Sequence, residues 1–211
     1  MSLMNRILDI SMPIHQDMPV YKDLDAKRTL FETTSDFTLG ATHETRLHMD
    51  AHAGTHVDAP LHMIEGGAGV ESILLSQLIR PCRVVDLTTV RDAITREDVV
   101  RVAPAEGDFL LMKTQNSFSE VWNPEFVYLR EDAANYLAAV GVAGVGIDGL
   151  GVERSQPDHP THKTLMRAGA IIIEGLRLGH VEPGIYNMVA APLAVMGIDA
   201  APARVILLEQ A

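Results

Sequence analysis

The sequence has few of the features that mark disulfide-rich, nucleic-acid-binding or membrane proteins. Its only cysteine, Cys82, excludes an internal disulfide, and a lone thiol is typical of a protein in the reducing cytoplasm. The 17 Lys and Arg residues are outnumbered by 28 Asp and Glu, and the net charge of −11 argues against binding to nucleic acid or to an anionic membrane surface. No apolar run approaches the roughly 20 residues of a membrane span. Asn5, Arg6 and Asp9 interrupt the first apolar stretch, so we expect no signal peptide.

Length and composition are those of one globular domain. The 211 residues suffice for one sizeable core, and contents of 47% hydrophobic and 21% charged residues are ordinary for such a protein. No internal repeat, low-complexity tract or linker interrupts the chain. We therefore expect a single domain that spans residues 1–211.

Strand-like segments outnumber helix-like ones. Apolar or alternating patterns predict strands at 8–10, 27–31, 42–49, 84–87, 109–113, 144–148, 170–174, 186–190 and 205–208. Helices are predicted at 72–78, from Thr95 onward, at 130–140 with Gly141 as its stop, and at 161–168 after Pro160. The predicted fold class is mixed α/β (α+β) with a strand-rich centre.

Three histidines and an aspartate stand at even spacings in residues 52–62. The segment reads His52-Ala-Gly-Thr-His56-Val-Asp58-Ala-Pro-Leu-His62. Alternate side chains of an extended chain point to one face, so all four groups are expected to face the same small volume. Neutral imidazoles and a carboxylate suit zinc or manganese, and no thiolate lies nearby to select a softer ion. The segment therefore predicts a metal site.

A helix would also bring His52 and His56 to one face, as in the zinc proteases with an H-E-x-x-H motif. Here Ala53 stands in place of the glutamate, and Gly54 and Pro60 disfavour a helix. We interpret the segment as a strand or an extended loop. The remaining alternative is a polar loop whose histidines only form hydrogen bonds, and four metal-type groups in this register speak against it.

Two later residues are candidates to complete the site. His162 lies at the opening of the helix after Pro160, and Glu174 ends a strand of three isoleucines. A carboxylate at the end of a buried strand is paired, metal-bound or at the rim of a sheet, because an unpaired buried charge is costly. For Glu174 these alternatives stay open at this point. Asp148 ends a neighbouring strand in the same manner and is the weaker candidate.

The chain resembles the cyclase-family metal-dependent hydrolases, which include bacterial kynurenine formamidases and isatin hydrolases. The resemblance rests on the string His52-x-Gly54-Thr55-His56-x-Asp58-x-Pro60-x-His62, followed by His162 and Glu174-Gly175-Leu176. It covers most of the chain, from residues 8–11 to the last strands. The resemblance implies a swivelling β/β/α fold that assembles as a homodimer or homotetramer.

The resemblance also implies a role for each site residue. It places His52, His56 and Asp58 on a first metal, His162 on a second, and Glu174 between the two. His62 takes the place of the proton-transfer histidine of the family. Five protein ligands and a water exceed the four-coordinate shell typical of one zinc, which favours two ions. Isatin hydrolase-like members are associated with a single manganese, so one or two Zn²⁺ ions, or Mn²⁺, remain open.

The chain departs from the kynurenine formamidase pattern after the first strand. Those enzymes carry there a tryptophan that is thought to pack on the aromatic substrate, whereas this sequence has Tyr21 in the corresponding place. Tyrosine can still stack on an aromatic ring, so Tyr21 is a candidate substrate residue. The polar segment 113–117 is expected either at the mouth of the pocket or in an ordinary turn, and Phe118 and Trp122 are expected in the core.

The sequence thus predicts a cytoplasmic enzyme that hydrolyses a C–N amide bond in a small aromatic molecule. The first candidate substrate is an aryl formamide such as N-formylkynurenine. A metal lowers the pKa of bound water to about 7, and His62 would carry a proton from that water to the leaving nitrogen. The alternatives are hydrolysis of an isatin-type cyclic amide, a metal-dependent dehydratase or cyclase, and a metal- or ligand-binding protein without turnover. The last alternative gives His62 no role.

Overall fold

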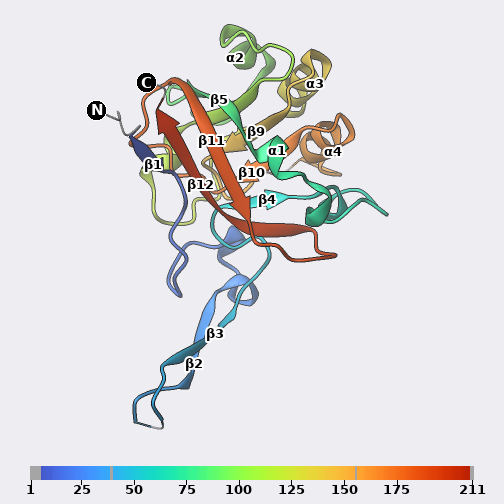
Figure 1. The fold of residues 1–211 in the computed structure, drawn as a ribbon. Coiled ribbons are helices and arrows are strands. Elements are labelled where there is room, and N and C mark those ends of the chain that lie inside the picture. The colour runs from blue at the N-terminus through green and yellow to red at the C-terminus, as the bar shows by residue number, and fades with distance from the viewer. Residues whose placement is uncertain (1–5, 39, 155, 210–211) are drawn as a thin grey trace, which may run out of the picture.

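A computed structural model describes residues 6–38, 40–154 and 156–209. The main sheet has eight strands: β1 (Ile7–Asp9), β4 (His56–Asp58), β5 (Ile79–Asp86), β7 (Phe109–Lys113), β9 (Gly144–Ile147), β10 (Ile171–Glu174), β11 (Gly184–Pro192) and β12 (Ala200–Glu209). Their order is β1-β12-β11-β5-β7-β9-β10-β4, and β4 also pairs with β12. The sheet therefore closes into a barrel-like ring, with β1 added outside it along β12 (Figure 1).

The parallel part of the ring consists of β5, β7, β9 and β10. Every residue of β7, β9 and β10 is buried, as expected where both faces of a parallel sheet are covered. Three helices lie on the outer side of these strands (Figure 1): α2 (Arg96–Arg101), α3 (Glu131–Val140) and α4 (Pro160–Arg167). The fourth helix, α1 (Leu75–Leu78), leads directly into β5.

The hydrophobic core has two main parts that use alternate residues of the same strands. Phe109 and Leu111 of β7 belong to the cluster inside the ring, together with residues of β4, β5 and β10 to β12. Leu110 and Met112 belong to the cluster under the helices, with Leu137 of α3 among others. The alternation of side chains along a strand thus fills both layers.

Local signals in the sequence predict the helix ends well. Thr95 and Asp98 form a reciprocal capping box at the start of α2. Gly141 ends α3 with φ 81°, in the left-handed region that glycine adopts at low cost. Pro160 opens α4, as expected. The predicted helix at 72–78 is instead a 3₁₀ turn, η4 (Val70–Ser72), followed by the short α1.

A β-hairpin projects from the body of the molecule (Figure 1). The strand expected at 27–31 begins later, as β2 (Leu30–Ser35), and pairs with β3 (Glu44–His48). Before it lie two 3₁₀ turns, η1 (Tyr21–Asp23) and η2 (Asp25–Lys27). The remaining elements are β6 (Ala93–Ile94), β8 (Tyr128–Leu129), η3 (Pro60–His62) and η5 (Gln115–Phe118).

The prediction of a mixed α/β fold with a strand-rich centre is confirmed by this architecture. The elements that matter most for the site are β4, β10 and the start of β12, which lie side by side. In the part of the chain that the structure describes, no helix combines the length and apolar character needed to cross a bilayer.

Candidate metal centre

The segment 52–62 is extended only in its middle. His52 lies in a turn before β4, and Gly54, with φ 64°, takes the left-handed conformation there. Pro60 opens the 3₁₀ turn η3, which is closed by a hydrogen bond from the His62 N–H to the Ala59 oxygen. The expectation of one extended segment is therefore wrong at both ends. A glycine turn and a proline turn, rather than strand alternation alone, bring the histidines together.

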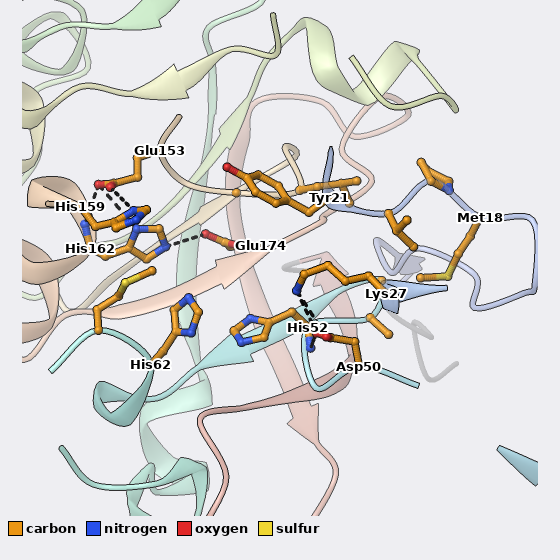
Figure 2. Close-up of a pocket in the computed structure, with 17 residues that line it drawn as sticks. Met18, Tyr21, Lys27, Asp50, His52, His62, Glu153, His159, His162 and Glu174 are labelled. Carbon is orange, nitrogen blue, oxygen red and sulfur yellow. Dashed lines mark hydrogen bonds and ion pairs between the residues drawn. The ribbon is translucent and has the colours of Figure 1, made fainter. Parts of the chain in front are cut away.

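Strand pairing brings the distant candidates to this segment. In the antiparallel pair of β4 and β10, Glu174 stands directly opposite His56, and Ile172 stands opposite Asp58. His162 comes from the first turn of α4, close to its start at Pro160. The end of β10 and the start of α4 thus bring Glu174 and His162 beside the histidine segment (Figure 2).

Asp58 lies at the centre of the resulting cluster. Its Oδ1 is 3.1 Å from His52 Nδ1 and 3.5 Å from His56 Nε2, and its Oδ2 is 3.7 Å from His162 Nε2. Glu174 contacts two of the same rings, with Oε2 3.3 Å from His56 Nε2 and Oε1 3.2 Å from His162 Nε2. All five residues expected from the sequence to bind metal are therefore gathered around one small volume.

The donor set of this cluster fits a divalent cation. The Asp58 side chain is 0% exposed, yet neither of its oxygens has a hydrogen-bond partner, and the same holds for buried His56 Nε2. His56 Nδ1 donates to the Gly54 oxygen at 2.9 Å, so Nε2 carries the lone pair that faces the carboxylates. A buried carboxylate without a donor is costly, and a bound cation removes that cost. Imidazole nitrogens with carboxylate oxygens suit zinc or manganese.

Carboxylates that the sequence analysis missed stand behind the histidines. Glu153 Oε2 accepts the backbone N–H of His162 and lies 3.5 Å from its Nδ1, while Oε1 is 2.9 Å from His159 Nδ1. Asp199 Oδ2 lies 3.0 Å from His52 Nε2. Such outer carboxylates orient ligating imidazoles in metal sites. Neither Glu153 nor Asp199 stands at a fixed sequence spacing from residues 52–62. The only sequence feature that could have indicated one of them is that Glu153 lies close to His162 in the chain.

The nearby carboxylates shift the pKa values of the site histidines by different amounts. Burial lowers the pKa of His52 and of His162, but hydrogen bonds and attraction to the carboxylates outweigh it and raise the pKa of His52 to about 9 and that of His162 to about 10. Burial raises the pKa of Glu174, but His162 and His56 hold it well below its ordinary value. Burial lowers the pKa of His62. Attraction to Asp58 opposes this shift, and the neighbouring imidazoles of His52 and His162 lower the pKa further. His62 is therefore the imidazole that stays neutral.

A cavity of about 200 Å³ opens onto the cluster (Figure 2). Met18, Val20 and Tyr21 line its apolar wall, and Lys27 forms an ion pair of 3.3 Å with Asp50 beside them. His62 lines the cavity next to the proposed ligands, as expected for a group that meets substrate.

Aromatic side chains fix Tyr21 in this wall. Its ring packs edge-on against Trp122 at 5.1 Å and against Phe126 at 6.4 Å between centroids. Trp122 is half-buried in this group, whereas Phe118 is 61% exposed, so the expectation that Phe118 lies in the core is wrong.

Asp148, the weaker ligand candidate, has a different role. Its buried carboxylate accepts hydrogen bonds from Thr114 and Ser117, through both backbone N–H and side-chain hydroxyl groups. The polar segment 113–117 therefore folds around Asp148 and does not line the cavity that opens onto the metal-type cluster. Asp148 also stands outside every metal-type cluster among the described residues.

Comparisons with known proteins show what the chain is similar to. A family profile described as Putative cyclase matches residues 8–154. The kynurenine formamidase of Salinibacter ruber is 35% identical, over 83% of this chain and 82% of its own. A solved structure described as a potential metal-dependent hydrolase with cyclase activity is 51% identical, covers 98% of each chain and superposes with a TM-score of 0.92. Isatin hydrolase A from Labrenzia aggregata shares the fold, with a TM-score of 0.81 at 23% identity over 96% and 93% of the two chains.

Proposed function

The chain belongs to the Cyclase family and is a metal-dependent hydrolase of non-peptide amide bonds, and we propose that its substrate is an aryl formamide such as N-formylkynurenine. The observation that carries the proposal is Asp58, a buried carboxylate that has imidazoles around it and no hydrogen-bond donor. The similarity to kynurenine formamidases supports the choice of substrate.

We propose that His52, His56 and Asp58 hold one ion, that His162 binds a second, and that Glu174 lies between the two. Five protein ligands exceed the shell of a single zinc, which favours two ions. Bound zinc or manganese would supply an activated water and polarise the amide carbonyl.

His62 is the proposed proton carrier of the reaction. It lines the cavity and its lowered pKa keeps its imidazole neutral, so it can accept a proton at neutral pH. The water oxygen forms a bond to the formyl carbon, His62 takes the proton of that water, and the same proton passes to the nitrogen as the C–N bond breaks. The products are formate and the free aryl amine.

The cavity suits a flat aromatic substrate. Tyr21 presents its ring on the side of the cavity where Glu174 and Glu153 lie (Figure 2). Because Trp122 and Phe126 hold Tyr21 in place, its ring is positioned before substrate binds. We propose that Tyr21 packs on the aryl ring of the substrate, in the role that the sequence analysis expected.

We further propose a homodimer or homotetramer that works in the cytoplasm. An isolated two-stranded hairpin is marginally stable in water, and the β2–β3 hairpin exposes Leu30, Phe37 and Leu47 to solvent. Cover by a second copy of the chain would account for these apolar side chains. A single, buried Cys82 supports a reducing compartment.

A side-by-side assay of N-formylkynurenine and isatin, with Zn²⁺ or Mn²⁺ supplied, tests the substrate. We expect release of formate from N-formylkynurenine, with kcat/KM at least about tenfold above that for ring opening of isatin, a difference of about 1.4 kcal/mol in transition-state stabilisation. Faster opening of isatin would make the cyclic amide the substrate. Inactivity on both compounds would overturn the proposal.

Dehydration or cyclisation is the second candidate, because the solved relative at 51% identity is described as having cyclase activity. The two reactions differ in the fate of solvent oxygen. Turnover in H₂¹⁸O puts one labelled oxygen into formate if the enzyme hydrolyses the formamide. Turnover of substrate without any label in the product would favour the second candidate.

A further inference from the structure

The Asp199 carboxylate joins two histidines of the site. Its Oδ2 lies 3.0 Å from His52 Nε2 and 3.3 Å from His62 Nδ1. The two imidazole rings lie next to each other, with centroids 4.2 Å apart. An ionised carboxylate can only accept hydrogen bonds, so both ring nitrogens that face it carry hydrogen.

The fold, rather than chance, places Asp199 at this point. It directly precedes β12, in which Ala200 stands opposite Asp58 of β4. The Ala59 N–H donates to the Asp199 backbone oxygen at 2.8 Å, and the Val70 N–H donates to the oxygen of the preceding residue at 2.9 Å. Asp199 and the residue after it are thus held against β4 and Ala59, and the residue before it is held against η4.

The contact determines which nitrogen of His62 can act as a base. A neutral imidazole has one N–H donor and one lone-pair acceptor. When Nδ1–H donates to Asp199, the lone pair lies on Nε2, the nitrogen on the other side of the ring. Without that partner the ring is free to rotate and to exchange tautomers, and Nε2 would then carry hydrogen for part of the time.

We propose that Asp199 is a positioning residue that holds His62 in the Nδ1–H tautomer, with Nε2 as the proton-accepting atom, while the same oxygen orients His52. This inference rests on the proposed function, in which His62 carries the proton. Nε2 takes the proton from water as the new C–O bond forms and returns it to the amide nitrogen as the C–N bond breaks. His62 therefore ends each turnover in the tautomer in which it began.

A double-mutant cycle tests whether Asp199 acts through His62. We expect Asp199→Asn to lower kcat/KM for N-formylkynurenine by about 10- to 100-fold at saturating zinc, the usual cost of losing an outer partner. In a His62→Ala background the same change should cost several-fold less than in the wild type, because only its effect on His52 remains. Losses that multiply in the double variant, or full activity of Asp199→Asn, would overturn the proposal.

Asp50→Asn is the matched control for the cycle. Asp50 also accepts a hydrogen bond from His52, through the backbone N–H at 2.9 Å, and no contact joins it to His62. The fold losses in kcat/KM caused by Asp50→Asn and by His62→Ala should therefore multiply in the double variant. Zinc content is measured for every variant. A folded Asp199→Asn protein that fails to retain zinc at saturation would assign Asp199 to metal binding instead and would overturn the proposal.

A spectroscopic readout decides the proposal independently of substrate. Long-range ¹H–¹⁵N spectra of the zinc-loaded protein report the tautomer of each imidazole, and the signals of His62 are those missing in His62→Ala. We expect the Nδ1–H tautomer in the wild type and a shift toward Nε2–H in Asp199→Asn. An Nε2–H tautomer in the wild type, or the same tautomer in both proteins, would refute the role of Asp199. Absence of formamidase activity would instead overturn only the proposed function.

Discussion

At the scale of single residues, the histidines of the site differ by the carboxylates around them. His52 touches both Asp58 and Asp199, and its pKa is raised to about 9 in spite of burial. His62 touches only the half-exposed Asp199, and its pKa is lowered. One segment thus supplies both a histidine suited to hold a cation among carboxylates and a neutral histidine suited to carry a proton.

His62→Ala is expected to keep the metal and to lose most of the activity. General acid–base groups contribute about 10²- to 10⁴-fold to rate, so kcat should fall within that range. Zinc content and formate release are measured on the same samples. His48→Ala is the control, because His48 is an exposed histidine on β3 that pairs with Glu32 and does not line the cavity. Full activity in His62→Ala would remove His62 from the mechanism.

The metal-free protein is expected to lose stability as the pH rises above about 6.5. The folded-state pKa values of His52 and His162 lie above the ordinary value, at about 9 and about 10. Their contribution to stability is therefore complete below about pH 6.5 and is lost as the pH rises through the folded-state values. Urea midpoints of metal-free protein from pH 6 to pH 10 measure this loss.

Zinc should change this pH dependence, because ligating imidazoles are unprotonated. Zinc-loaded protein should show little of the alkaline loss in the same urea series, and zinc binding near pH 7.5 should release more than one proton. Equal slopes with and without zinc would show that His52 and His162 are not ligands.

Part of the site could be predicted from residues close in the chain. His52, His56 and Asp58 stand at spacings that bring their side chains together in a short segment, whichever turns flank it. Asp199 and Glu153 could not be found in this way. Their approach to the histidines depends on the pairing of β4 with β12 and on the loop that leads into α4, and no local pattern encodes either of these.

At the scale of elements, β4 is the short strand on which the site depends. It has three residues, all buried, and pairs with β10 on one side and β12 on the other. The turn just before it is fastened by Thr55, whose hydroxyl donates to the Gly175 oxygen at 2.6 Å and accepts the Met12 N–H at 2.7 Å. These two hydrogen bonds of Thr55 hold the histidine segment against the end of β10.

Gly175→Ala should therefore weaken the fold more than an ordinary loop substitution. Gly175 has φ 69°, and a Cβ there would collide with the Gly54 backbone oxygen. Gly169 has φ 78° with open space around it, so Gly169→Ala is the matched control. We expect a loss of about 1–2 kcal/mol for Gly169→Ala from the left-handed backbone alone. A further loss of about 1–3 kcal/mol from overpacking is expected for Gly175→Ala. Urea unfolding measures the loss of stability in both variants. Equal losses would contradict the role of the close approach between Gly175 and Gly54.

Element boundaries could be predicted where local chemistry decides them. Thr95 with Asp98 starts α2, and Gly141 ends α3, because capping groups lie within a few residues of the backbone they satisfy. The start of β2 could not, because its pairing with β3 decides where the strand begins. The two ends of the 52–62 segment are set by the turns at Gly54 and Pro60.

At the scale of the whole molecule, closure of the sheet brings the site together. β4 comes early in the chain and is inserted between β10 and β12, so residues from the first third lie beside residues from the last quarter (Figure 1). The cavity then forms where the loop at 18–27, residues 150–153 and His159 approach this strand. An amino-acid pattern can predict strands, but the order in which they close is a property of the complete chain.

The prediction for assembly concerns the projecting β2–β3 hairpin. Light scattering after size exclusion should give two or four times the chain mass of 23.0 kDa. Leu30→Ser with Leu47→Ser should shift the protein toward the monomer, because both side chains are more than half exposed on the hairpin. Val100→Ser, at an exposed position of α2, is the control. A monomeric wild type would contradict the proposed assembly and leave the metal site unaffected.

The central claim is that the cluster around Asp58 hydrolyses an aryl formamide by means of bound metal. The most direct test measures formate released from N-formylkynurenine as zinc or manganese is added back stepwise to metal-free enzyme. We predict almost no formate without metal and a rate that rises in proportion to the metal bound, up to saturation. Undiminished hydrolysis by metal-free enzyme, or no formate at full metal occupancy, would contradict the account.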